Sequence, residues 1–219
     1  MASTTDDLNR RFKSAANRAA DGIQAGDDPY DAAAYGGPGK VAAPGYAANV
    51  AAVIAGDNRI IQIFNQGLDA YHTPIFTQPL LNRGDAFWVH FFTNNLPNPT
   101  PYRVYVCTQL AQTHNVLQQL LQGYNAPLKF KVATHPEAQQ RNDTIVSWHQ
   151  SLADARLWAN IARANAGLLD GEAPAGTFGG IDTSAVGIDS EVAGDTSTSR
   201  IARAAVGVAA KRLRNNPYL

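Results

Sequence analysis

The chain has very little cysteine: Cys107 is the single one among 219 residues. One cysteine excludes a disulfide framework and a cysteine-rich zinc site, so we expect Cys107 to be a small core residue. No apolar run approaches the roughly 18 residues that a membrane span needs, and the N-terminus has no apolar signal segment. We therefore expect a soluble, cytoplasmic protein with no membrane partner.

Charge is scarce as well. Charged residues make up 16% of the chain, and 18 Lys and Arg balance 18 Asp and Glu, whereas a typical charged share is roughly 25%. A neutral chain lacks the positive surplus that nucleic-acid binding requires, so we expect no nucleic-acid partner. The chain has 13 arginines and 5 lysines. Arginine is the better phosphate ligand of the two, because its planar guanidinium can donate two hydrogen bonds to one phosphate.

Motifs of metal sites and of common hydrolases are absent. The five histidines form no His-Glu-x-x-His pattern, so no metal site is expected. The chain also has no Gly-x-Ser-x-Gly elbow, which removes the usual serine-hydrolase signature.

Hydrophobic patterning predicts one α+β domain with an antiparallel central sheet flanked by helices and a loose N-terminal segment. Residues 1–45 would form a helix (1–20) and a Gly/Pro/Ala-rich linker (27–45), and residues 46–219 the α+β domain. Apolar residues at helical spacing occupy 49–54 and 59–68. The predicted strands are 86–93, 102–108, 128–133 and 144–149, and the further helices are 110–124, 154–168 and 199–213. Residues 86–93 and 102–108 would pair with each other, and residues 169–199 form a long loop, either a lid or a disordered insertion.

His90 lies in the middle of the aromatic strand 86–93. Strand alternation places it on one face with Trp88 and Phe92. It is either a structural histidine bonded to the backbone under an aromatic cover, or a general acid or base tuned by its apolar surroundings.

Several basic residues occupy strands, loops and a helix start. Lys129 and Lys131 share one face of their strand, Arg103 begins the strand before it, and Arg141 lies in the next loop. Arg200 opens the last helix after the N-cap residues 195–199, where backbone amides favour an anion. These cations indicate a phosphate pocket; the alternative is ordinary surface charge extending over the sheet.

Five short segments carry a resemblance to the bacterial Hop-A-type type III effector family. They are Arg103-Val-Tyr-Val106, Phe130-Lys-Val132, Arg141-Asn-Asp143, Gly187-Ile-Asp-Ser-Glu191 and Ser197-Thr-Ser-Arg200. The resemblance covers about residues 80–219. Members of this family include stand-alone lyases of class V lanthipeptide and thioamitide biosynthesis, and the family is distantly similar to the phosphothreonine lyases.

The resemblance implies β-elimination of phosphate from a phosphoserine or phosphothreonine of a peptide, leaving a dehydroamino acid. That reaction needs a base, an acid and cations, and no metal or organic cofactor. His90 would be the general acid. Lys131 and Arg141 match the family's Phe-Lys-Val and Arg-x-Asp positions, and Arg200 matches its last arginine. Arg103 and Lys129 would complete the phosphate site, and a separate kinase would supply the phosphorylated peptide.

The sequence departs from the lyase pattern at Trp88, which replaces the lysine base of a Lys-x-His strand motif. Trp148 replaces a tyrosine, and Thr198-Ser199 replace residues of the Phe-Gly type. An indole cannot abstract a proton, so either Lys129 or Lys131 supplies the base or the chemistry has been lost. The second hypothesis is therefore a non-catalytic subunit that binds a phosphopeptide or leader peptide beside a kinase. A third is an effector-like protein with a host or phage target.

Overall fold

The computed structural model describes residues 5–35, 40–67, 86–93, 100–134, 136–170, 185–190 and 197–215. Its helices are α1 (Thr5–Gln24), α2 (Pro29–Tyr35), α3 (Tyr46–Ala55), α4 (Thr113–Gly123), α5 (Pro136–Gln139), α6 (Leu152–Ala164) and α7 (Ser197–Arg214). The strands are β1 (Ile60–Gly67), β2 (Ala86–Thr93), β3 (Tyr102–Val106), β4 (Lys129–Ala133), β5 (Ile145–His149) and β6 (Val186–Ser190). They form one sheet in the order β1-β2-β4-β5-β3-β6, and every neighbouring pair is antiparallel. The predicted α+β class is confirmed.

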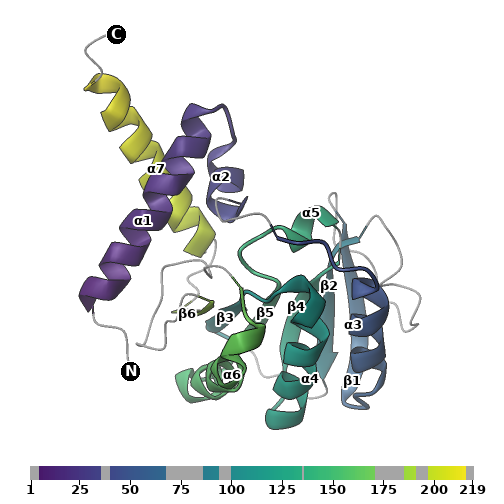
Figure 1. The fold of residues 1–219 in the computed structure, drawn as a ribbon. Coiled ribbons are helices and arrows are strands. Elements are labelled where there is room, and N and C mark those ends of the chain that lie inside the picture. The colour runs from purple at the N-terminus through teal and green to yellow at the C-terminus, as the bar shows by residue number, and fades with distance from the viewer. Residues whose placement is uncertain are drawn as a thin grey trace.

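One face of the sheet carries the main hydrophobic core. Figure 1 shows α3, α4 and α6 lying over this face. Alternate strand residues point into it, and the buried set includes Val89, Phe91, Phe130, Val132 and Ile145. Because successive side chains of a strand point to opposite faces, the residues between them must lie on the other side of the sheet.

The core also holds a short polar chain. The Tyr124 hydroxyl lies 3.1 Å from Nδ1 of His149, and the Ser147 hydroxyl lies 2.8 Å from Nε2 of the same ring. Trp158 packs edge-on against Tyr124. Burial lowers the pKa of His149 to about 3, so the ring is neutral at neutral pH.

Helices α1, α2 and α7 form a second, smaller cluster beyond the β3–β6 end of the sheet (Figure 1). Alanines dominate their contact, among them Ala19, Ala33 and Ala205. Small side chains let the helices approach closely. A Cβ on Gly22 of α1 would lie only 3.0 Å from the Cβ of Ala32 on α2. We call α1, α2 and α7 the three-helix unit.

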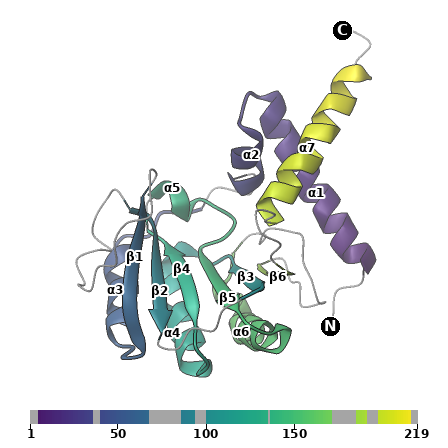
Figure 2. The same ribbon diagram turned by 180° about the vertical axis from the view of Figure 1, so that it is seen from behind.

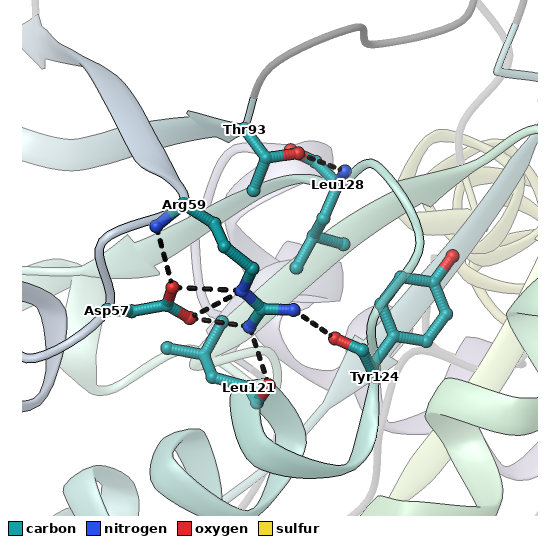
Figure 3. Close-up of polar contacts among 6 residues, drawn as sticks. All are labelled: Asp57, Arg59, Thr93, Leu121, Tyr124 and Leu128. Carbon is teal, nitrogen blue, oxygen red and sulfur yellow. Dashed lines mark hydrogen bonds and ion pairs between the residues drawn. The ribbon is translucent and has the colours of Figure 1, made fainter.

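Arg59 joins the α3–β1 turn to the end of α4 (Figure 3). Its guanidinium pairs with Asp57 and donates to the carbonyl oxygens of Leu121, at 2.6 Å, and Tyr124, at 2.5 Å. The last carbonyls of a helix have no partner within the helix, so this arginine satisfies two of them at the end of α4.

Four sequence predictions are corrected by the structure. Residues 60–67, predicted as helical, form β1, because β-branched and aromatic residues favour a strand where the apolar spacing is ambiguous. Strands β2 and β3 do not pair with each other; β4 and β5 lie between them. Residues 186–190, within the predicted loop 169–199, form β6. Residues 29–35, within the predicted linker, form α2.

The remaining predicted elements match α1, α3, α4, α6, α7, β2, β3, β4 and β5 to within a few residues. The predicted lid lies mostly outside the described residues, as do positions 195 and 196 of the predicted anion-binding helix start. No helix in the described ranges is long and apolar enough to cross a membrane.

Candidate functional site

The second face of the sheet carries two rows of residues, most of them polar or aromatic. Figure 2 views the sheet from this side, with the strands in front of α3, α4 and α6. Across β2, β4, β5, β3 and β6, the first row reads Phe92, Lys129, Trp148, Arg103 and Asp189. The second row, in the same strand order, reads His90, Lys131, Val146, Tyr105 and Gly187.

Each cation of these rows lies over an aromatic ring. The Nζ atom of Lys131 is 4.0 Å from the centre of the Trp88 ring. The Nζ of Lys129 is 4.6 Å from the Trp148 ring, and the guanidinium carbon of Arg103 is 5.1 Å from that same ring. Such contacts favour the charged form of a cation while its methylene stem covers apolar surface.

Lys131 has a strongly lowered pKa. Burial lowers its pKa from 10.5 to about 7, and Arg141, Arg103 and Lys129 lower it further by charge repulsion. Asp143 opposes this change by attraction. About half of the Lys131 side chains therefore carry no proton near pH 7, and a neutral amine is a competent base.

His90 faces Lys131 across β2 and β4. Its ring stacks on Trp148 at a centroid distance of 5.8 Å and on Phe92 at 6.5 Å. Burial lowers the pKa of His90 to about 3, and the charges of Lys131, Lys129 and Arg103 contribute in the same direction. The imidazole is therefore neutral at neutral pH in the ligand-free protein.

Two carboxylates hold the arginines at the border of the site. Asp143 accepts a hydrogen bond of 3.0 Å from Nε of Arg141, and both side chains are almost fully buried. Asp189 pairs with Arg200, which joins the sheet to α7. Burial raises the pKa of Asp189, while Arg200 and Arg103 lower it. The site thus keeps a positive centre, with its negative groups at two edges.

Tyr105 lies between these edges. Its hydroxyl accepts a hydrogen bond of 3.4 Å from Nη1 of Arg103. Burial raises the pKa of Tyr105 above its ordinary value, so the phenol stays protonated.

The structure brings His90, Arg103, Lys129 and Lys131 onto one face of the sheet, with Arg141 beside them. Lys131 and Arg141 both lie within 6 Å of the Trp88 ring. Arg200 lies farther along the same face, where its partner Asp189 is opposite Arg103 in the register.

Sequence reasoning assigned no role to Tyr105, Asp143 or Asp189. The last two were visible in the motifs Arg141-Asn-Asp143 and Gly187-Ile-Asp-Ser-Glu191, where a carboxylate accompanies a strand or an arginine. Tyr30 was also missed. Its ring centre lies 5.6 Å from the guanidinium carbon of Arg141, and the signal was the helix start Asp28-Pro29.

A pocket of about 530 Å³ lies away from this face, between the end of α3 and α4. Its described lining includes Val53, Asn58, Gln118 and Gln122. None of the site's cations (Arg103, Lys129, Lys131, Arg141 and Arg200) is among these lining residues. Among the described residues, no three His, Cys, Asp or Glu side chains gather as metal ligands.

Comparison with solved structures finds the same fold in two bacterial effector proteins. The effector protein from Pseudomonas syringae pv. tomato strain DC3000 is 13% identical with a TM-score of 0.57, over 95% of this chain and 89% of that chain. The effector protein from Pseudomonas syringae pv. syringae strain 61 is 12% identical with a TM-score of 0.58, over 88% and 86%. No family model and no curated protein matches the sequence. The chain therefore has an effector-like fold, and the similarity includes most of its length.

Proposed function

We propose that the protein is a lyase that removes phosphate from a phosphoserine or phosphothreonine of a peptide by β-elimination. Its place would be lanthipeptide or thioamitide biosynthesis, beside a separate cytoplasmic kinase. The observation that carries the proposal is Lys131: a lysine whose pKa is lowered to about 7, inside a cluster of three further cations. A base poised near neutral pH and an anion site in the same place are the two requirements of this reaction.

In this reaction Lys131 takes the proton from Cα of the phosphorylated residue. The electron pair of that C–H bond forms the Cα–Cβ double bond, and the Cβ–O bond breaks. Inorganic phosphate leaves with the electron pair of the broken bond. The products are a dehydroamino acid and phosphate, so no oxidant, reductant or water is consumed.

The cations bind the phosphate and stabilise the charge that develops as it leaves. Lys129 and Arg103 approach from one side over Trp148, and Arg141 from the other beside Trp88. Arg200 contributes from α7. Groups that are already fixed around the leaving oxygen need little reorganisation during the reaction.

His90 acts as the acid only when the ligand is bound. In the free protein, burial and neighbouring cations keep it neutral. A bound phosphate dianion offsets the repulsion from these cations, which is a smaller cause of the low pKa than burial, so it raises the pKa of the imidazole and favours proton donation to the leaving oxygen.

A second candidate function is that of a non-catalytic subunit that binds a phosphopeptide or leader peptide for a kinase. Trp88 favours it, because its ring lies 4.0 Å from Nζ of Lys131 and stabilises the protonated, non-basic amine. The same anion site then binds the phosphate and leaves it intact.

Mass spectrometry of a short acetylated peptide with one central phosphothreonine distinguishes the two candidates. Elimination yields a peptide that has lost phosphoric acid and adds a thiol across its new double bond, whereas hydrolysis restores threonine. We expect the eliminated product, and a loss of at least about a hundredfold in rate for Lys131→Met. Lys211→Met, at the end of α7, is the matched control and keeps full activity. Tight binding without product identifies the binding subunit, and a threonine product refutes the lyase.

A further inference from the structure

The segment between α5 and β5, which carries Arg141, contacts the N-terminal part of the chain through three consecutive residues. The backbone N–H of Lys40 donates to the Gln140 side chain at 2.8 Å, and that side chain donates back to the Lys40 carbonyl at 3.4 Å. The Arg141 guanidinium carbon lies 5.6 Å from the centre of the Tyr30 ring. The backbone N–H of Asn142 donates to the carbonyl of Ala34 at 3.2 Å.

Tyr30 is held firmly enough to act on its neighbour. The Asp28 carboxylate accepts a hydrogen bond of 2.8 Å from the backbone N–H of Tyr30, which caps the start of α2, and Pro29 occupies the first helical position. The other side of α2 is buried in the three-helix unit through Ala32 and Ala33. The Tyr30 side chain itself remains 41% exposed.

Arg141 in turn is 7% exposed and is fixed from several directions. Asp143 binds its Nε, and the Trp88 ring centre lies 5.8 Å from its guanidinium carbon. The Tyr30 ring adds a contact that comes from outside the sheet and its connections. An aromatic ring beside a guanidinium limits the planes that the guanidinium can adopt, and a defined plane is what a two-point contact with phosphate requires.

We propose that Tyr30 is a positioning residue of the anion site, so that α2 contributes to one wall of the phosphate pocket through this ring. This deepens the proposed function and rests on it, because the ligand is the phosphorylated peptide. Tyr30 acts through Arg141: its ring orients the guanidinium, and Arg141 contacts the phosphate. The N-terminal segment, which the sequence predicts to be loose, therefore contributes a positioning residue to the site.

The test measures binding of the phosphothreonine peptide by calorimetry, with its unphosphorylated form as reference, and every protein of the series carries Lys131→Met so that the peptide is not eliminated during the titration. Tyr30→Leu removes the ring and should weaken phosphate-dependent binding about three- to tenfold, the size expected of a partly exposed cation–π contact. Tyr30→Phe keeps the ring and should bind within about twofold of the wild type. Leu157→Ala, a similarly exposed apolar position on α6, is the control and should change nothing.

Thermal unfolding of each variant separates positioning from a purely structural role. Because Tyr30 is half exposed, Tyr30→Leu should keep the wild-type midpoint of thermal unfolding. If Tyr30→Leu lowers that midpoint, the binding test is repeated with Tyr30→Met, which retains the bulk of the side chain without a ring. Equal binding by wild type, Tyr30→Leu and Tyr30→Phe overturns the inference and leaves the proposed function intact. Weakening in Tyr30→Leu and Tyr30→Met with rescue in Tyr30→Phe supports it, even if no peptide is eliminated. No phosphate-dependent binding by the wild type overturns both.

Discussion

Removing one cation next to Lys131 should move the pH dependence of elimination in a direction that the structure fixes. Lys129 lowers the pKa of Lys131 by repulsion, and the neutral side chain of Lys129→Met has a similar length. The pKa of Lys131 should therefore rise from about 7 toward its ordinary 10.5. The base is the unprotonated amine, so the rate in the variant should reach half its maximum at a higher pH.

The magnitude follows from the fraction of neutral amine. At pH 7 about half of the wild-type Lys131 side chains lack the proton, against about one in three thousand for a lysine with a pKa of 10.5. Lys129 is the smallest of the causes and burial is unchanged in Lys129→Met, so the pKa stays well below 10.5. A rise of about one unit would lower the neutral fraction at pH 7 about fivefold, and a smaller rise would lower it less, while the rate at pH 9 changes little. Weaker phosphate binding would instead lower kcat/KM by a similar factor at every pH.

Two measurements check this prediction. The first is kcat/KM for the phosphothreonine peptide between about pH 5.5 and 9.5, which reports the free enzyme and should rise around neutrality in the wild type. The second is NMR titration of the lysine side chains, which the chain's five lysines make tractable and which needs no catalysis. A Lys131 titration above pH 9 in the wild type, or an unchanged midpoint in Lys129→Met, would refute the reasoning. Lys13→Met, on α1, is the control and should leave the midpoint in place.

Two further predictions concern stability. The pKa of His149 is about 3 in the folded protein and 6.5 when unfolded, so unfolding takes up a proton below pH 6.5. The stability that the buried, neutral His149 contributes is complete above pH 6.5 and is lost as pH falls toward 3. Between pH 6.5 and 5, the free energy of unfolding should therefore fall by about 1–2 kcal/mol more in the wild type than in His149→Gln. Urea unfolding at both pH values measures this, and parallel losses in the two proteins would contradict it. Arg59→Met leaves Asp57 and two carbonyls at the end of α4 without their arginine partner. It should lower the free energy of unfolding by about 1–3 kcal/mol, measured by urea unfolding at pH 7.5. Arg214→Met, at the exposed end of α7, is its control, and equal losses in both would show that Arg59 is dispensable.

The sequence predicted the elements of the sheet better than their order. The aromatic and β-branched run of β2 and the Lys-x-Lys alternation of β4 identify strands and the faces of their residues, because alternation is a local property. The choice of partner is not local: β4 and β5 insert between β2 and β3 through contacts that no spacing encodes. Strand β6 was missed because its five residues contain Gly187 and lie in a Gly- and Ser-rich stretch, where turn signals outweigh β propensity.

The candidate site shows the same difference between what local spacing predicts and what depends on contacts distant in sequence. Lys129, Lys131 and His90 could be placed on one face from period-two spacing alone. Their electrostatic effect on one another depends on burial and on the register between strands, which set the low pKa of Lys131 and of His90. Tyr30 could not be linked to Arg141 from the sequence, since about 110 residues separate them and only the packing of α2 brings them together.

The order of synthesis determines when the three-helix unit can form. α1 and α7 come from opposite ends of the sequence and bury their alanine faces against each other. During synthesis, α1 and α2 emerge early and can contact each other, but their remaining alanine faces stay uncovered until α7 has left the ribosome. The sheet can fold earlier from strands that are nearer in sequence, whereas the packing of α2, which carries Tyr30, is complete only once α7 is present. A chain stopped before α7 would therefore carry Lys131 but lack part of the packing that supports Tyr30 beside Arg141.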